Sequence, residues 1–340
     1  MFDWKWYLSD IKQDKDIKVF SCFSCGGGSS MGYKRAGFQV IGNVEIDPQV
    51  NAIYKKNLNP KYNYLMDLRQ FNQIPNEELP EELFNLDILD GSPPCTTFSV
   101  AGKREETWGQ KKKFREGQTE QVLDDLFFVF LDTVEKLKPK VVVAENVAGL
   151  LKGNAKGYVN QIIKRFHSLG YEVQLFKLNA AKMNVPQSRE RVFFIANNQG
   201  FPKLKLSFNG KPILFGEVRT EHGQDFKSSE IYKELLKYKL PTDKKISDIS
   251  ERVRGKYSGF NHSIIHDNEM CRTIAAHGRM FRYCDGLKFS DFDFINCSSF
   301  PQDYNFSGMR PQYMCGMSVP PNMMANIAAE LYKQWLKQQK

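Results

Sequence analysis

Three features of the sequence predict an α/β fold with a mostly parallel sheet and a smaller loop-rich region. A strand-like run at residues 17–23 leads into a glycine-rich turn and a helix-like segment, which is how a Rossmann-like unit begins. Strand-like and helix-like segments then alternate as far as residue 196. The alternation is lost over residues 197–284, which are rich in Lys, Gly, Phe and Ser. We therefore expect residues 1–196 and 285–340 to form one domain that ends in a helix, with residues 197–284 as a second domain between them.

The composition indicates a soluble globular chain. The 340 residues are 41% hydrophobic, which is enough for a packed core. The formal net charge of +9 suits a polyanionic partner, although solubility alone explains it equally well. Since no apolar run of about 18 residues and no signal-peptide core occurs, we expect a cytoplasmic protein without a membrane span. The seven cysteines are odd in number and irregularly spaced, which favours free thiols over disulfides.

Carboxylates follow the second and third predicted strands. A helix predicted at residues 31–36 is followed by a strand at residues 38–44, and Glu45 stands at its end, about 20 residues past the glycines. A carboxylate in that place suits the hydroxyls of a ribose. Asp67 follows a strand at residues 62–65 and suits an adenine amino group. The glycine-rich turn alone predicts little, but the three features together predict a site for an adenosine-containing cofactor.

A stiff turn places Cys95 at the carboxyl end of another strand. Asp87 to Leu89 resembles the end of a buried strand, which Asp90, Gly91 and Ser92 are expected to break. Pro93 and Pro94 then fix the backbone directly before the cysteine. A lone cysteine is more often a buried small hydrophobe. Here the rigid approach and the polar residues that follow favour presentation of the sulfur at the sheet edge where ligands bind.

The polar segment at residues 100–119 follows Cys95 and holds six basic against two acidic residues between positions 103 and 115. It is either a solvated loop or a mobile lid over a phosphate backbone, and its position favours the lid. Apolar spacing predicts a helix over residues 121–137, and a buried strand over 141–144 precedes Glu145. A carboxylate there needs a partner or a task. A helix cap is the simpler interpretation, but the next helix, near residues 158–169, begins too far along.

Two arginines introduce the strand predicted at residues 192–196, which follows another strand at 171–178. Arg189 and Arg191 alternate on an extended segment and therefore project to one side, where they form either an anion or carbonyl clamp or surface charge pairs.

Cys22 and Cys25 form a C-x-x-C without a second ligand pair, so no metal is expected. Near the end, apolar residues predict an amphipathic helix through Trp335.

Six stretches resemble, in chain order, the motifs of the C5-cytosine DNA methyltransferases of restriction-modification systems, from about residue 19 to residue 329. They are the glycine-rich loop with Phe23, Gly27, Gly28, Gly32 and Gly37, then Pro94-Cys95, Glu145-Asn146-Val147, Gln187-x-Arg189-x-Arg191, Arg272-Thr-Ile274 and Gly316-Met-Ser-Val319. Cys25 stands where the family usually has glycine, and Met317 where it has asparagine. The insert at residues 197–284 occupies the place of the family's target recognition domain.

The resemblance implies the class I S-adenosylmethionine-dependent methyltransferase fold, a seven-stranded sheet with helices on both faces. It implies S-adenosylmethionine as the cofactor, bound by Phe23, Cys25, Gly26, Gly27, Gly28, Glu45, Ile46, Asp67, Leu68, Ser92, Pro94, Leu126, Ser318 and Val319. It implies catalysis by Cys95, Glu145, Arg189 and Arg191, and substrate contacts by Ser99, Lys103, Arg104, Asn146 and Gln187. The expected partner is double-stranded DNA, the expected state is a monomer, and a cognate restriction endonuclease acting separately is left open.

These residue types suit methyl transfer to C5 of a flipped-out cytosine. A thiolate on C6 makes C5 nucleophilic, Glu145 assists at N3, and the arginines hold the O2 side. A tRNA cytosine-C5 methyltransferase of the same fold is the nearest alternative. A nicotinamide-dependent oxidoreductase accounts for the glycine-rich loop and Glu45 but leaves Cys95 and Glu145 unexplained. A catalytically inactive DNA-binding relative is disfavoured because all four catalytic residues are present.

Overall fold

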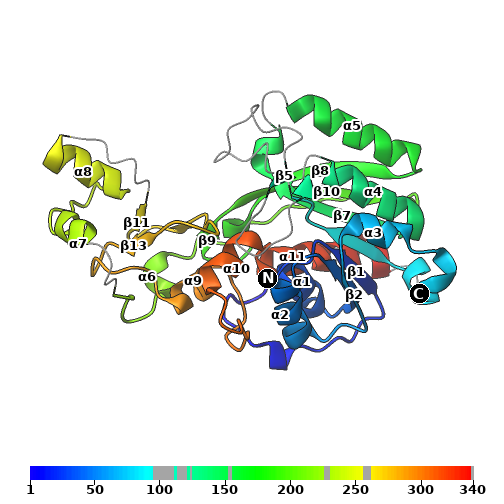
Figure 1. Ribbon diagram of the computed structural model, residues 1–340, viewed down its shortest axis with the longest axis horizontal. Helices are drawn as coiled ribbons and strands as arrows, with labels where there is room; N and C mark the ends of the chain where they lie inside the picture. The colour runs from blue at the N-terminus through cyan, green and yellow to red at the C-terminus, as the bar shows by residue number, and fades with distance from the viewer. Residues whose placement is uncertain are drawn as a thin grey trace.

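The structure is a computed structural model that describes residues 1–94, 111–112, 121–122, 125–151, 155–225, 230–255 and 262–337. Its centre is a seven-stranded sheet with the order β3-β2-β1-β4-β7-β10-β8 (Figure 1). The first five strands in that order are parallel, and β10 runs antiparallel to both of its neighbours. The strands are β1 (Lys18–Cys22), β2 (Gln39–Glu45), β3 (Tyr62–Leu65), β4 (Ile88–Gly91), β7 (Val141–Val147), β8 (Glu172–Asn179) and β10 (Glu190–Asn197). The predicted Rossmann-like α/β class is confirmed.

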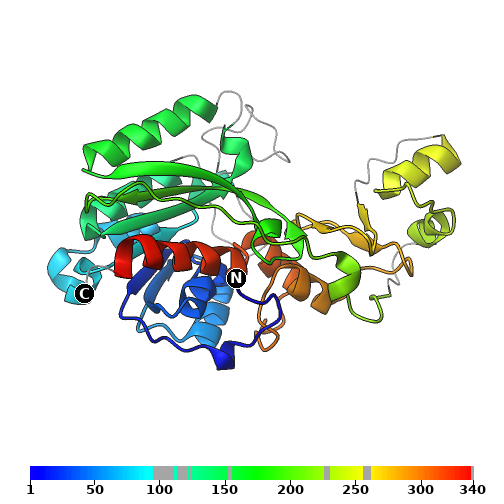
Figure 2. The ribbon, with the colours of Figure 1, turned by 180° about the vertical axis from the view of Figure 1, so that it is seen from behind.

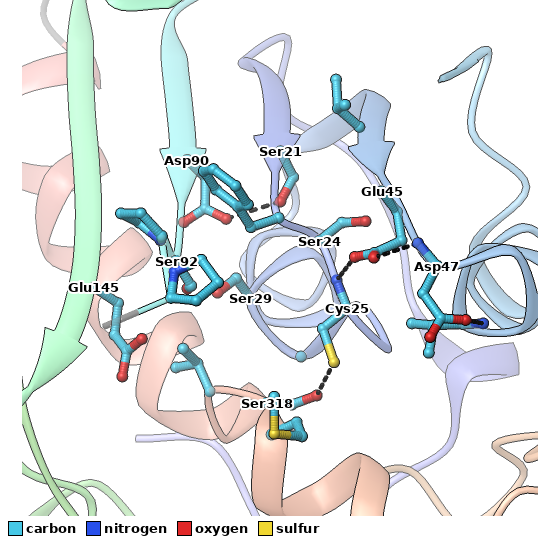
Figure 3. Close-up of a pocket in the computed structure, with 18 of the residues that line it drawn as sticks. Ser21, Ser24, Cys25, Ser29, Glu45, Asp47, Asp90, Ser92, Glu145 and Ser318 are labelled. Atoms are coloured by element: carbon cyan, nitrogen blue, oxygen red, sulfur yellow. Dashed lines mark hydrogen bonds between the residues drawn. The ribbon is translucent and has the colours of Figure 1, made fainter. Parts of the chain in front are cut away.

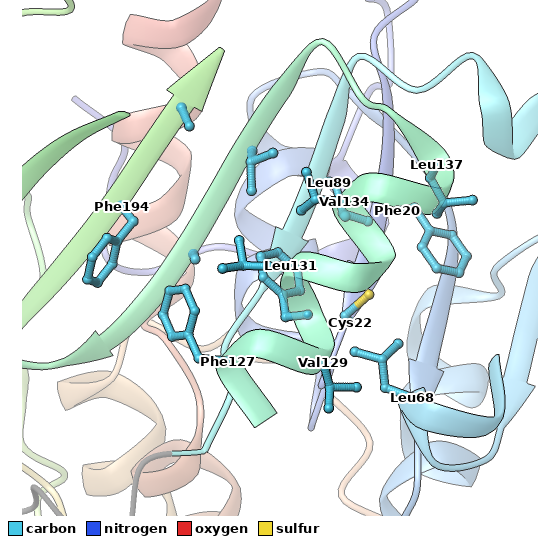
Figure 4. Packing of buried hydrophobic residues seen from close by; sticks show 14 of the residues in the cluster. Phe20, Cys22, Leu68, Leu89, Phe127, Val129, Leu131, Val134, Leu137 and Phe194 are labelled. Atoms are coloured by element: carbon cyan, nitrogen blue, oxygen red, sulfur yellow. The ribbon is translucent and has the colours of Figure 1, made fainter. Parts of the chain in front are cut away.

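Helices cover both faces of this sheet (Figures 1 and 2). They are α1 (Gly28–Arg35), α2 (Pro48–Leu58), α3 (Leu68–Gln73), α4 (Leu126–Leu137), α5 (Ala155–Ser168) and α11 (Pro321–Leu331). Helix α10 (Pro311–Met317) packs instead against α1 and α2 in a separate cluster. Because successive strand residues point to opposite faces, β7 supplies both cores. Val142 and Ala144 join the cluster that contains α4, whereas Val141 and Val143 join the cluster that contains α11. Figure 4 shows the first cluster, in which Phe127 of α4 lies against the sheet.

The end of the chain packs back onto its beginning. Helix α11 lies against α1, and the absence of a side chain at Gly32 permits this close approach, since a Cβ there would lie 2.6 Å from the main-chain oxygen of Pro321. The last turn is a π-helix, Tyr332–Leu336, in which Trp335 is buried and donates to the Pro202 carbonyl. The segment that precedes α11 is thereby fixed beside the glycine-rich loop.

Most of the described residues between positions 215 and 297 form a smaller, elongated part that extends away from the sheet (Figure 1). Its elements are α6 (Phe215–Val218), α7 (Glu230–Leu236), α8 (Ile246–Arg254), β11 (Ser263–Ile265), β12 (Cys271–Arg272), β13 (Met280–Arg282) and α9 (Asp291–Cys297). Short β12 pairs with β9 (Gln187–Ser188), which ties this part to the sheet domain. A small core joins Phe215 to Phe289 and Phe294, on the far side of residue 284. The domain boundaries at residues 197 and 284 stay a prediction.

Several predicted elements begin or end elsewhere. Strand β7 continues through Glu145 to Val147, and β4 continues through Asp90 to Gly91, although we expected these residues to follow or break the strands. Helix α4 begins at Leu126 rather than at residue 121, and Gln121–Val122 instead pairs with Lys111–Lys112 as β6 with β5. The rest of the predicted lid, residues 100–110 and 113–119, lies outside the described residues. Within the described parts of the chain, no helix has both the length and the apolar character needed to span a bilayer.

Candidate active site

The carboxyl ends of five neighbouring strands open into one cavity of about 470 Å³. A side chain near the end of each strand, or just beyond it, lines this cavity, and together these side chains form a row in the spatial order of the sheet. The row runs from Asp67 after β3 through Glu45 of β2, Ser21 of β1 and Asp90 of β4 to Glu145 of β7. Figure 3 shows four of these side chains reaching into the cavity. The topology therefore gathers carboxylates that are far apart in the sequence.

Glu45 holds the turn at one end of the row. Its carboxylate accepts hydrogen bonds from the backbone N–H of Cys25 at 2.8 Å and of Asp47 at 2.9 Å (Figure 3). Burial raises the pKa of Glu45, while these N–H groups oppose the rise. Asp47 in turn caps α2 by accepting from Gln49 and Val50. A carboxylate this firmly held keeps unused lone pairs on each oxygen for ligand hydroxyls.

Cys25, a predicted cofactor residue, lines the cavity, and its thiol lies 3.9 Å from the Ser318 hydroxyl. Burial, with the nearby Glu45 carboxylate, raises the pKa of the Cys25 thiol to about 12. The thiol is therefore neutral near pH 7 and unsuited to act as a nucleophile or a metal ligand. Its place in the turn is structural: Cys25 adopts a φ of 47°, in the left-handed region where glycine is usual.

The three glycines of the turn have different surroundings. Gly28 lines the cavity, and a Cβ there would lie 2.1 Å from the Val319 carbonyl oxygen, so Ser318 and Val319 approach only because Gly28 has no side chain. Gly26 and Gly27, both predicted to contact a cofactor, are outside the described cavity lining. The Gly26 carbonyl accepts from the Tyr304 hydroxyl at 2.7 Å. These two glycines therefore form the side of the turn that packs against neighbouring helices and Tyr304.

Most of the other predicted cofactor residues line the cavity, namely Phe23, Ile46, Asp67, Leu68, Ser92, Pro94, Ser318 and Val319. Asp67 caps α3 by accepting from the Arg69 N–H at 2.8 Å and forms an ion pair with the same residue. Leu126 does not belong to the described lining and instead packs in the hydrophobic core beneath α4. A residue at the start of an amphipathic helix resembles a site residue in sequence, but here the apolar side chain points inward.

Glu145 and Arg191 form an ion pair at the other end of the row. Arg191 Nε lies 2.8 Å from Glu145 Oε1, and both side chains are largely buried. The antiparallel pairing of β7 with β10 places the two residues on neighbouring strands, with Arg191 opposite Val147 and Phe193 opposite Glu145. Asn146 donates to the Pro93 carbonyl at 3.2 Å, which ties β7 to the segment that leads to position 95. The predicted Glu145-Asn146 pair therefore joins the strand end to the Pro-Pro turn.

Arg189 has a different role from Arg191. Its guanidinium donates to the carbonyl oxygens of Ile274 at 3.1 Å, Gly316 at 2.9 Å and Ser318 at 3.1 Å. Burial lowers the pKa of Arg189 to about 9, which still leaves it charged near pH 7. The two arginines line the same cavity, as their spacing predicts, but their guanidinium groups bind different partners. Arg189 positions the cavity wall formed by Gly316, Ser318 and Val319, and Arg191 orients Glu145.

Gln187 supports the same wall and does not belong to the described cavity lining. It is fully buried, accepts from the Ile274 N–H at 3.1 Å and donates to the Cys297 carbonyl at 3.2 Å. Both backbone groups of Ile274 are thus held, one by Gln187 and one by Arg189. Sequence reasoning gave Gln187 a substrate contact, whereas the structure gives it a supporting position.

The predicted residues Cys95, Ser99, Lys103 and Arg104 lie outside the described residues. The chain reaches position 95 along the cavity wall, because Ser92, Pro93 and Pro94 all line it. Sequence reasoning missed Asp90 and Ser21 as lining residues. The available signal was the one used for Glu45, a carboxylate at the carboxyl end of a buried strand, but Asp90 was interpreted as a strand breaker.

A family model described as C-5 cytosine-specific DNA methylase matches residues 17–285 of this chain. The chain belongs to this family. The resemblance drawn from the motifs is therefore confirmed. Among the described residues, no three His, Cys, Asp or Glu side chains are arranged to hold a metal ion.

Named relatives agree with the family. The methylase is 28% identical over 346 residues to the type II methyltransferase M1.HphI of Haemophilus parahaemolyticus, covering 93% of this chain and 87% of that one. It is 28% identical to M.Sau96I of Staphylococcus aureus, covering 95% and 77%. A crystal structure of a protein assigned as a DNA modification methyltransferase from an E. coli prophage has a TM-score of 0.66 at 19% identity, covering 95% and 100%, and supports the fold alone.

We expect Arg189→Lys to destabilise the methylase by about 2 kcal/mol, because a lysine cannot reach three carbonyls in the fixed geometry of a guanidinium. Denaturant unfolding measures this loss. Arg165→Lys is the matched control, since Arg165 forms ion pairs with Asp132 and Glu135 on exposed helix surfaces and should lose no more than about 0.5 kcal/mol. Equal losses in the two variants would contradict the positioning role of Arg189.

Proposed function

We propose that this methylase transfers a methyl group from S-adenosylmethionine to C5 of a cytosine flipped out of double-stranded DNA, with Cys95 as the covalent nucleophile. One observation carries the proposal: a single cavity joins the Glu45 end of the sheet, the Pro93-Pro94 wall and the Glu145–Arg191 pair. A cofactor site and a reaction site that share one space allow direct transfer between two bound molecules.

The residues present fit S-adenosylmethionine. Glu45 is firmly oriented and suits the ribose hydroxyls, and Asp67, just after the neighbouring strand, suits the adenine amino group. Gly28 and Ser29 begin α1, whose N-terminus favours the carboxylate of the cofactor. Ser318 and Val319 close the opposite wall. When bound, this cofactor supplies an electrophilic methyl group.

The chain's own residues would prepare the cytosine. The Cys95 thiolate bonds to C6, which raises the electron density at C5, and this bond breaks again when the C5 proton is removed. Glu145, when it carries a proton, donates a hydrogen bond to N3 of the ring and so draws charge away from the ring. Arg191 holds the Glu145 carboxylate from the neighbouring strand and presents positive charge to the O2 side. Asn146 fixes the turn before Cys95.

A cytosine within a duplex cannot enter a cavity of this kind, so the base must be flipped out. The basic segment between positions 103 and 115 and the insert at residues 197–284 are the proposed DNA-binding parts. Neutralised phosphates release counterions, so affinity for DNA should fall steeply with salt. The recognised sequence would be set by the insert, and a companion endonuclease would act as a separate protein.

Methylation of defined substrates tests this function. The protein is incubated with labelled S-adenosylmethionine and either double-stranded DNA or tRNA, and the DNA of a host that expresses it is sequenced after bisulfite treatment. We expect label in DNA and protected cytosines within one recurring sequence. Label in tRNA alone would favour the RNA methyltransferase. Binding of a nicotinamide cofactor without S-adenosylmethionine would favour an oxidoreductase.

A further inference from the structure

Asp90 is a buried carboxylate in the cavity to which the proposed reaction gives no task. It belongs to β4, is 1% exposed and lines the cavity. One oxygen accepts from the Ser21 hydroxyl at 2.9 Å (Figure 3). The other oxygen accepts from the Tyr33 hydroxyl at 3.3 Å. Among the described residues, no lysine or arginine forms an ion pair with Asp90. A buried carboxylate that lacks a cation is costly, and such groups are kept where a ligand supplies the charge.

Among the described residues, the titratable groups that interact electrostatically with Asp90 are neutral or negative. They are Cys22 of β1, Tyr33 of α1, Tyr54 of α2 and Glu145 of β7. Burial, together with the negative charge of Glu145 and against the two hydroxyl hydrogen bonds, raises the pKa of Asp90 to about 7. The cavity's two arginines are occupied elsewhere, Arg191 by Glu145 and Arg189 by main-chain carbonyls. The described part of the chain therefore supplies no cation to this carboxylate.

The position of Asp90 in the row indicates which part of a ligand it meets. β4 lies between β1 and β7, and β1 separates it from β2, where Glu45 suits the ribose. Neighbouring strands are about 4.8 Å apart, so β4 lies about 10 Å from β2 along the sheet edge. A cofactor with its ribose at β2 and its methyl group directed toward Glu145 at β7 must cross β4. The part that crosses carries the sulfonium and the α-amino group.

We propose that Asp90 binds the positively charged methionyl end of S-adenosylmethionine. This inference rests on the proposed function and assigns one of its binding contacts. The group that Asp90 binds is a cation, either the sulfonium or the α-ammonium of the cofactor. Ser21 and Tyr33 orient the Asp90 carboxylate toward it. Asp90 is thus a binding residue for the charged cofactor and is not part of the covalent chemistry.

Cofactor binding should then release a proton from Asp90. In the empty cavity the carboxyl is protonated below about pH 7, because burial raises its pKa. A bound cation favours the carboxylate and lowers that pKa, so affinity should rise with pH between about 6 and 8 and level off above. The wild type is expected to bind S-adenosylmethionine about tenfold more tightly at pH 8 than at pH 6.

Titration calorimetry of the full chain tests this contact. Asp90→Asn keeps the shape and the hydrogen-bonding capacity but removes the charge. We expect it to bind S-adenosylmethionine about 10- to 100-fold more weakly at pH 8 and to lose the proton release, measured in buffers of different ionisation enthalpy. Asp87→Asn is the matched control, because Asp87 stands just before β4 at its other end and pairs with Lys140 outside the described cavity lining. It should change affinity by less than about threefold.

Two further ligands separate the charges. S-adenosylhomocysteine keeps the ammonium but has no sulfonium, and 5′-methylthioadenosine has neither. A loss confined to S-adenosylmethionine assigns Asp90 to the sulfonium, and a loss shared with S-adenosylhomocysteine assigns it to the ammonium. An equal loss for all three ligands, or none, would overturn the proposal. If the wild type binds no S-adenosylmethionine, the proposed function itself fails, which is a different result.

Thermal unfolding without cofactor checks whether the Asp90→Asn variant is folded. Ionisation of Asp90 in the folded, empty protein opposes its burial, so the protein loses stability as pH rises from the unfolded carboxyl value toward about 7. Without cofactor at pH 8, Asp90→Asn should therefore melt at least as high as the wild type. A variant that folds better but binds the cofactor less well would separate the binding role from a structural one.

Discussion

Replacing Cys95 with serine is expected to abolish methyl transfer while S-adenosylmethionine still binds. A hydroxyl at this position is a far weaker nucleophile than a thiolate, so the bond to C6 would not form. The proposed cofactor contacts, chiefly those of Glu45 and Asp67, lie at the ends of other strands and should not depend on the sulfur. Transfer of labelled methyl groups measures the first effect, and calorimetry measures the second.

Trapping makes the Cys95 prediction sharper. An oligonucleotide with 5-fluorocytosine at the target position cannot lose a proton from C5, so the adduct with the wild type should persist and be detected by mass. Cys284→Ser is the matched control, since Cys284 is exposed in the smaller part of the protein and should form the adduct normally. Adduct formation by Cys95→Ser, or its absence in the wild type on every nucleic acid tried, would remove the covalent mechanism.

Replacing Glu145 with glutamine is expected to lower the rate of methyl transfer by at least about 100-fold. The glutamine amide cannot deliver a proton to the ring and no longer attracts Arg191. Because the substitution changes the reacting end of the cavity, the turnover number should fall much more than the Michaelis constant for S-adenosylmethionine rises. Single-turnover assays measure the chemical step directly.

Glu190→Gln provides the comparison for Glu145. Glu190 begins β10, one residue before Arg191, and its ion pair with Lys177 is half exposed. Its loss should change the rate by less than about twofold and stability by less than about 1 kcal/mol. If Glu145→Gln behaves like Glu190→Gln, the pair that Glu145 makes with Arg191 is structural and the proposed role at N3 is wrong.

The sequence predicted the central strands well because they are buried on both faces. Continuous apolar runs such as Val141 to Ala144 are unusual outside a covered parallel sheet. The strand at residues 62–65 was also predicted to the residue, although it is only partly buried. Strand ends were predicted less well. Polar residues such as Asp90 and Glu145 suggest a turn, yet their strands continue through them because the backbone hydrogen bonds of the neighbouring strands persist.

Sequence motifs predicted which residues belong to the site better than they predicted the contacts between those residues. Motifs located Glu45, Glu145 and Arg191, and the structure brings them to one cavity. They did not show that Arg189 holds the carbonyls of Gly316 and Ser318, because that contact joins residues more than a hundred positions apart. Leu126 was assigned to the cofactor from its place in the chain, and only packing shows that it belongs to the core.

The cavity is closed by a wall that is synthesised last. All seven strands of the main sheet precede residue 198, whereas Ser318 and Val319, which pack against Gly28, come after the whole insert. A nascent chain on the ribosome therefore contains all seven strands well before it contains this wall. A product truncated within the insert would keep the strand residues but lack this wall, so the cavity can be complete only after residue 319 has been added.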